Sequence, residues 1–90
     1  MRYAEQSKAL LQAENPGELA RLKQAGLLDE VLNEVQETYS QQESALVKQM
    51  TADLPGNLSS QERMQKENMA ATTAREIASS DMIEFWRSCR

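Results

Sequence analysis

Only three glycines and two prolines interrupt this chain of 90 residues. They fall at three places, Pro16-Gly17, Gly26 and Pro55-Gly56. The stretches between them are rich in Ala, Leu, Glu and Gln, which favour helices, whereas the β-branched Val, Ile and Thr supply only nine residues. We therefore predict an all-α fold, a small helical bundle or hairpin in which two short N-terminal helices lead into two long antiparallel helices.

Local signals set the expected helix boundaries. Asn15 is placed to cap the second helix, Gly26 can end it in the left-handed conformation, and Ser59 opens a capping box. Residues 81–89 are predicted either as a short terminal helix capped by Asp81 or as a continuation of the helix before it. The predicted helices of a single domain, 1–90, cover about 3–13, 16–25, 28–50 and 60–79.

The amino-acid composition excludes several kinds of catalytic and metal-binding site. The chain has no histidine, which excludes histidine-based catalysis and most zinc sites, and its one cysteine, Cys89, excludes an internal disulfide. No glycine-rich phosphate loop is present. We therefore expect a protein that is not an enzyme, with no catalytic residue, no cofactor and no metal. No apolar run approaches the roughly 18 residues that span a membrane, and the start lacks the pattern of a signal peptide, so we expect a cytoplasmic protein.

The apolar core is thin for a chain of this size. Leu, Ile, Val and Phe supply only sixteen of the 90 residues, below the roughly 20 % at which disorder becomes a concern. A net charge of −4 is modest, which argues against disorder. Burying apolar surface against a second molecule would compensate for the thin core, so we expect a homodimer or a protein partner.

A heptad pattern runs along the third predicted helix. Its members follow one another at spacings of four and three, and one polar residue, Gln42, interrupts them. Two interpretations stay open: the seam packs against a neighbouring helix of the same domain, or it packs between chains. The apolar seam residues, our first candidates for an interface, are Leu28, Leu32, Val35, Tyr39 and Leu46.

The last helix carries two further features. Ala70, Ala74 and Ile77 are predicted to form a face of mostly small side chains that packs against the third helix. Phe85 and Trp86 are half of the aromatic residues of the chain. Such a pair can anchor a core or act as an interface hot spot, and we include both residues among the candidate interface positions.

An acidic face follows the third helix. Glu30, Glu34 and Glu37 lie at helical spacing, and no basic residue occurs between Leu27 and Leu46. This is the pattern of a solvated face or of a docking surface for a basic partner. The same charges would repel a phosphate backbone, which argues against direct nucleic-acid binding.

Together these features predict a non-enzymatic interaction or adaptor protein that acts through amphipathic helix packing, self-associated or bound to a partner. The alternative is an acidic regulator or inhibitor that occupies a basic, nucleic-acid-binding surface of a target protein.

Overall fold

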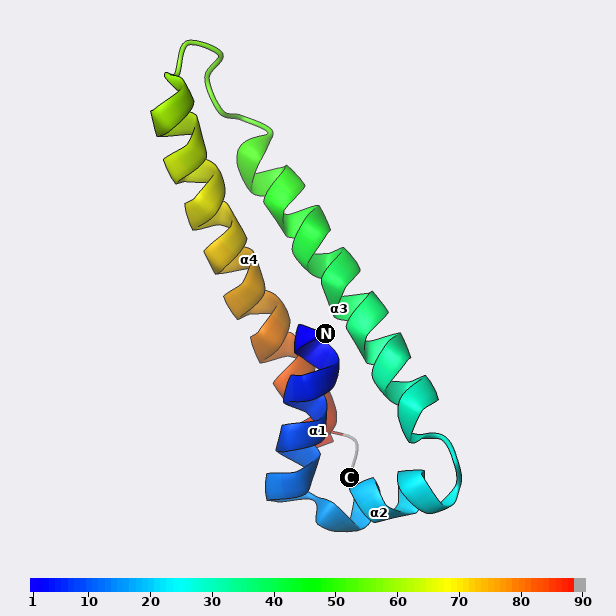
Figure 1. Ribbon diagram of the computed structural model, residues 1–90. Coiled ribbons are helices and arrows are strands. Elements are labelled where there is room, and N and C mark those ends of the chain that lie inside the picture. Colours follow the sequence, from blue (N-terminus) through cyan, green and yellow to red (C-terminus); the bar gives the residue numbers. More distant parts are fainter. Residues whose placement is uncertain (89–90) are drawn as a thin grey trace.

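A computed structural model describes residues 1–88 and confirms the all-α prediction. This range contains four helices and no strand, and its two long helices pair as an antiparallel hairpin (Figure 1). The helices are α1 (Arg2–Glu14), α2 (Pro16–Gln24), α3 (Leu28–Thr51) and α4 (Ser60–Ser88).

The local boundary signals are confirmed. The Asn15 side chain accepts a hydrogen bond from the amide of Glu18 at 3.4 Å and so caps α2. Gly26 follows α2 with a φ of 72°, a conformation that L side chains rarely adopt. Ser59 Oγ accepts from the amide of Glu62 at 3.2 Å at the start of α4.

The last helix does not break at Asp81. α4 runs for 29 residues to Ser88, so the continuation is confirmed and the separate capped helix is wrong. The carboxylate of Asp81 instead accepts a hydrogen bond from Gln42 Nε2 of α3 at 2.6 Å, which uses the side chain in a tertiary contact and not as a cap. Cys89, the last residue of the predicted segment, lies outside the described residues.

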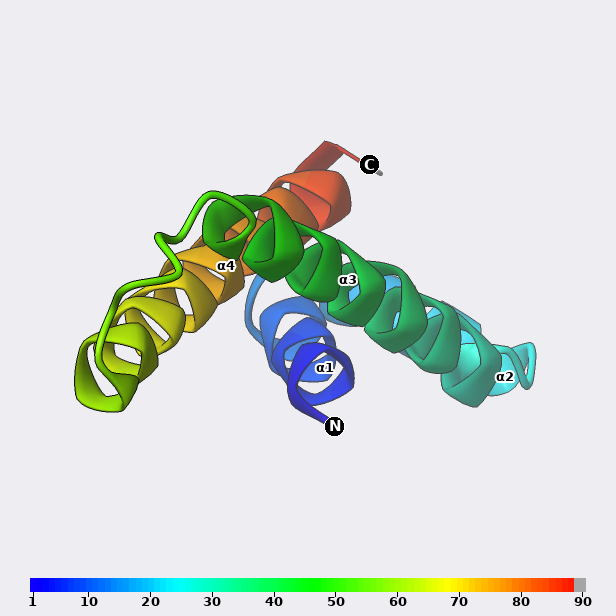
Figure 2. The same ribbon diagram turned by 90° about the horizontal axis from the view of Figure 1, so that it is seen from above.

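The molecule is elongated, with extents of 55 × 20 × 18 Å. Figure 2 shows α3 and α4 crossing, with α1 in the angle between them. Figure 1 shows that α1 covers only the lower part of the hairpin. α2 connects the lower end of α1 to the start of α3. The opposite end, with the loop between α3 and α4, has two helices and no third layer.

The buried core lies at the end of the hairpin that α1 and α2 cover. Its buried residues are Tyr3, Leu11, Leu19, Leu22, Val35, Ala78, Met82 and Trp86. All of them lie in α1, α2, the first half of α3 or the second half of α4. We call residues 43–75 the distal hairpin and the rest of the described chain the proximal half. The distal hairpin contains two buried residues, Ala70 and Ala74.

Candidate functional site

The heptad seam of α3 packs largely within the chain. Val35 is buried in the core, and Leu28 and Tyr39 are partly buried against it. Leu32 and Leu46 are half-buried. The intramolecular interpretation therefore accounts for Val35, Leu28 and Tyr39, and a role of Leu32 and Leu46 between chains stays a prediction.

The two terminal aromatic residues have different surroundings. Trp86 is buried, and its Nε1 donates to Ser7 Oγ at 2.8 Å. The Ser7 hydroxyl, fully buried, lies 3.1 Å from Met82 Sδ and donates to it. Phe85 is 43 % exposed, and its ring meets that of Trp86 edge-on at a centroid distance of 5.2 Å. Trp86 therefore belongs to the core, whereas Phe85 is a surface residue.

The buried residues of α4 follow one regular ridge. They lie four positions apart, as Ala70, Ala74, Ala78, Met82 and Trp86. Ile77 does not belong to this ridge: it is 37 % exposed, and Ala78 continues the buried face in its place. The expected close approach to α3 through small side chains holds for Ala70 and Ala74, which are buried.

A second ridge of α4 lies on its surface. Met69, Ile77 and Phe85 are 70 %, 37 % and 43 % exposed, and each directly precedes a residue of the buried ridge. We call these three residues the exposed ridge. The spacing of eight between them was visible in the sequence, but without the buried ridge nothing indicated on which side of α4 they lie.

A shallow groove crosses from α3 to α4 near the end of the distal hairpin. It is lined by Met50, Leu54, Lys66, Met69, Ala70 and Thr73. Lys66 is the one charged residue of this lining. Sequence reasoning missed the groove because its two sides come from residues nearly twenty positions apart.

Polar contacts attach the start of α1 to the middle of α3. Gln36 Oε1 accepts from the amides of Tyr3 and Ala4 at 2.8 and 3.1 Å, so a side chain of α3 caps α1. The Tyr3 hydroxyl donates to Glu43 Oε1 at 3.2 Å, and Arg75 pairs with the same oxygen at 3.3 Å. Burial, followed by the negative charge of Glu43, raises the pKa of Tyr3. These contacts mark the boundary between the two halves.

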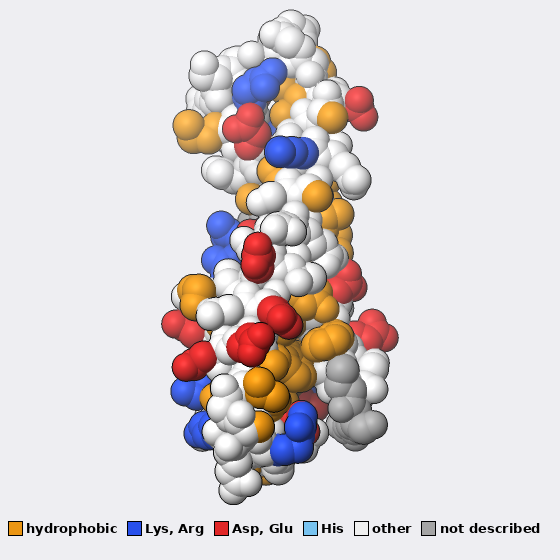
Figure 3. All heavy atoms as spheres, turned by 90° about the vertical axis from the view of Figure 1, so that its right-hand side faces the viewer, with side chains coloured by type: hydrophobic (Ala, Val, Ile, Leu, Met, Phe, Trp, Pro, Cys, Tyr) orange, Lys and Arg blue, Asp and Glu red, His pale blue; other side chains and the backbone are white. Residues whose placement is uncertain are grey.

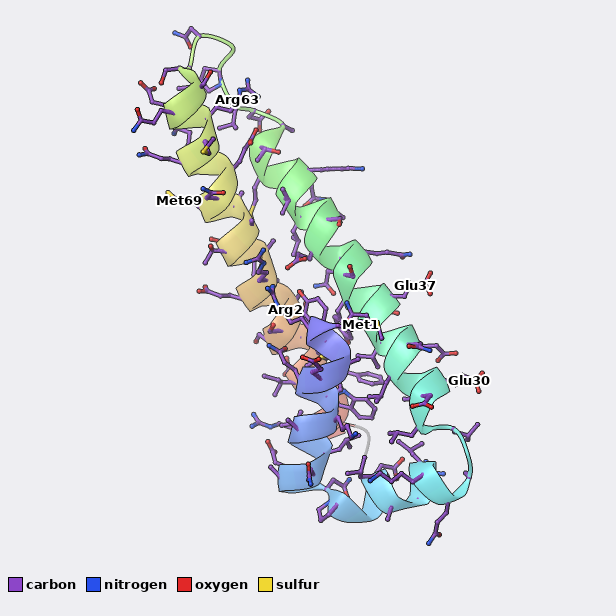
Figure 4. All side chains as sticks on the ribbon, in the orientation of Figure 1. Met1, Arg2, Glu30, Glu37, Arg63 and Met69 are labelled. Atoms are coloured by element: carbon purple, nitrogen blue, oxygen red, sulfur yellow. The ribbon has the colours of Figure 1, made fainter. Side chains whose placement is uncertain are left out.

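The acidic face is solvent-exposed. Glu30 and Glu37 point away from the other helices (Figure 4), and Glu34 is exposed as well. Figure 3 shows acidic and hydrophobic side chains side by side over the lower part of this side of the molecule. The ion pairs found among residues 1–88 involve other acidic residues and none of these three.

Within the described residues, no group of three potential ligands is arranged to hold a metal ion, and no helix is both long and apolar enough to cross a membrane. No protein-family model, curated protein or solved structure matches the chain. Its function must therefore be inferred from its own surfaces.

Proposed function

We propose that the protein is a non-enzymatic interaction protein, an adaptor that binds a partner or a second copy by packing helix against helix. The observation that carries the proposal is the exposed apolar surface of the distal hairpin. Met50, Met64 and Met69 are 37 %, 62 % and 70 % exposed there, where the hairpin has no third layer. A cytoplasmic location fits this role and stays an expectation.

The energetics of the distal hairpin favour a partner. Its buried side chains are Ala70 and Ala74 of α4, which bury little apolar surface, and isolated helical segments of this length are marginal in water. A partner that fully covered a methionine would gain about 1.5–3 kcal/mol for each such side chain. Methionine also suits a docking surface because its flexible thioether adapts to different neighbours.

Paired capture and affinity measurements test this proposal. Tagged wild-type protein is used as bait beside Met69→Lys and, as a matched control, Gln61→Lys, which adds the same charge at another exposed position of α4. We expect bound protein, including a second copy with a different tag, to be recovered by wild type and by the control but not by Met69→Lys. Binding should persist at about 0.5 M salt, because apolar packing is little screened. Equal recovery by all three baits would overturn the proposal.

A second candidate function rests on the acidic face. Glu30, Glu34 and Glu37 are exposed and take no part in the ion pairs of the described chain. A regulator that occupies a basic surface of its target would use such charges. Binding of such a regulator to its target would disappear at about 0.5 M salt. It would also disappear in a triple variant with glutamine at these three positions. Met69→Lys would leave this binding unchanged.

A further inference from the structure

The exposed apolar surface of the distal hairpin consists of thioethers. The large hydrophobic side chains exposed there, Met50, Met64 and Met69, are all methionines, whereas those exposed in the described proximal half include leucine, isoleucine and phenylalanine. The two buried side chains of the distal hairpin are alanines, which contain no sulfur. The surface that the proposed function uses is therefore open to oxidation in a way that leucine or valine would not be.

Met82 is the contrasting methionine of the core. Its side chain is fully buried, and the Ser7 hydroxyl donates a hydrogen bond to its Sδ at 3.1 Å. The Trp86 indole donates to the same Ser7 oxygen, so the sulfur is enclosed where α1 packs against α4. An oxidant in solution reaches Met82 only after this part of the chain opens, whereas it reaches Met64 and Met69 in the folded state.

Oxidation by hydrogen peroxide needs no residue besides the methionine itself. A lone pair of Sδ attacks one peroxide oxygen, and the S–O bond forms as the O–O bond breaks. The departing hydroxide takes the proton of the transferred hydroxyl group, which gives methionine sulfoxide and water. Sulfur is oxidised by two electrons and the peroxide is reduced by two. The product is a polar side chain at a position that was apolar.

The consequences of oxidation differ between the surface and the core. Met50 and Met69 both line the groove of the distal hairpin, so oxidation of the two converts much of its apolar lining to polar groups. Ala70 and Ala74, buried inside the hairpin, are not altered by this reaction. A sulfoxide at Met82 would instead place a polar oxygen in the core, where burial is costly. Oxidation confined to the exposed methionines therefore changes the surface while the fold remains.

We propose that Met50, Met64 and Met69 are reversible oxidation sites for a peroxide, and that their conversion to sulfoxides switches off helix packing at the distal hairpin without unfolding the chain. This regulation rests on the proposed function and acts at the same surface. It is reversible because methionine sulfoxide reductases restore the thioether, one enzyme for each sulfoxide epimer.

Titration of the full chain with hydrogen peroxide tests the sites. A Cys89→Ser background removes the thiol, which peroxide also oxidises. Cleavage after Lys and Arg places Met50, Met64, Met69 and Met82 in four different peptides for mass spectrometry. We expect Met64 and Met69 to react within about threefold of their rates in the denatured chain, Met82 to react at least about tenfold more slowly than in the denatured chain, and Met50 to fall between them. Equal rates for Met82 and Met69 in the folded chain overturn the proposal.

Melting curves of the same samples separate a change of surface from unfolding. While Met82 is still intact, the melting temperature should stay within about 5 °C of the untreated chain. A chain oxidised in denaturant, which carries the sulfoxide at Met82 as well, is the comparison and should melt at a lower temperature. An equally low melting temperature before Met82 reacts would contradict oxidation without unfolding.

Capture by oxidised bait tests the switch. In the Cys89→Ser background, bait oxidised at Met50, Met64 and Met69 should recover at least about tenfold less bound protein than its untreated sample. Incubation with both sulfoxide reductases should restore the recovery. Unchanged capture by the oxidised bait, or a loss that the reductases do not reverse, overturns the switch.

A sulfur-free variant of the hairpin is the matched control. The triple variant Met50→Leu, Met64→Leu and Met69→Leu has side chains of similar volume without a thioether, and it keeps Met1, which is exposed outside the hairpin. Peroxide-treated triple variant should recover as much bound protein as its own untreated sample. A loss as large as that of the wild-type side chains would place the sensitive residue elsewhere and contradict the proposal.

Failure of the switch and failure of the proposed function give different results. Untreated bait that captures neither another protein nor a second copy contradicts the proposed function and removes the switch, whereas the order of oxidation among the four methionines is measured without a partner. Normal capture that peroxide leaves unchanged contradicts the switch alone.

Discussion

The proximal half and the distal hairpin share the same two long helices, yet their contacts differ in kind. In the proximal half, α1 and α2 add a third layer, and Val35, Met82 and Trp86 are buried among their side chains. In the distal hairpin, the buried side chains are Ala70 and Ala74 of α4, while Met64 and Met69 are exposed to solvent. Helix propensity therefore specifies where the chain is helical, whereas the third layer decides where side chains are buried in a core.

The largest expected effect lies in the proximal half. Trp86→Ala removes a buried ring and leaves Ser7 without its indole donor, so we expect a loss of about 3–5 kcal/mol in the free energy of unfolding. Its neighbour Phe85, 43 % exposed, serves as control: Phe85→Ala should cost less than about 1 kcal/mol. Denaturant titrations at one fixed protein concentration measure both. Equal losses would mean that the two aromatic residues are not divided between core and surface.

The next largest effect on stability is expected at a buried position of the distal hairpin, and an exposed position of the same hairpin serves as control. Ala74 is fully buried, so Ala74→Leu forces the helices apart and should cost about 1–3 kcal/mol. Met64→Ala, at a site 62 % exposed, should change stability by less than about 0.5 kcal/mol. Denaturant titrations measure both variants. If Ala74→Leu left the free energy of unfolding unchanged, the helices of the distal hairpin would not pack closely.

A smaller effect tests the attachment of α1 at the boundary. Gln36→Ala removes the acceptor of the first amides of α1, and the loss of a helix cap typically costs about 1 kcal/mol. Hydrogen exchange at Tyr3 and Ala4 should become faster, whereas Gln41→Ala, at an exposed position of α3, should not change it. Unchanged exchange in Gln36→Ala would show that the cap is not formed in solution.

The smallest effect depends on pH. The pKa of Tyr3 is raised, chiefly by burial, so the folded state favours the neutral phenol. The resulting stability is intact below the unfolded value of about 10 and is lost as the pH rises above it through the folded pKa. Tyr3→Phe should therefore lose less stability than wild type as the pH rises above about 10, which melting temperatures across this pH range measure. Parallel pH curves would contradict this role of Tyr3.

The helices and their caps were predictable because their signals are local. Asn15, Gly26 and Ser59 act within one turn of their own positions, where sequence spacing determines geometry. The seam around Val35 was predictable for the same reason. The break at Asp81 was not excluded by any local signal, because Gln42, which engages that carboxylate, is 39 positions away.

The surfaces were harder to predict because they depend on tertiary placement. Phe85 and Trp86 are about 100° apart on one helix, and nothing local decides which of them faces the core. Ser7 is polar and yet fully buried, since its partners Trp86 and Met82 are contributed by α4. Which apolar residues form a docking surface becomes visible only once α1 has covered one side of the hairpin.

Hydrogen exchange of the whole chain, followed by mass spectrometry at low and high protein concentration, measures the stability of the two halves separately. At low concentration, we expect slow exchange in residues 30–39 and 78–86 and faster exchange in 44–50 and 64–72, because the distal hairpin has no third layer. If the partner is a second copy, protection in residues 64–72 should rise at high concentration. Uniform protection of α3 and α4 at both concentrations would contradict the division into a self-sufficient proximal half and a distal hairpin completed by a partner.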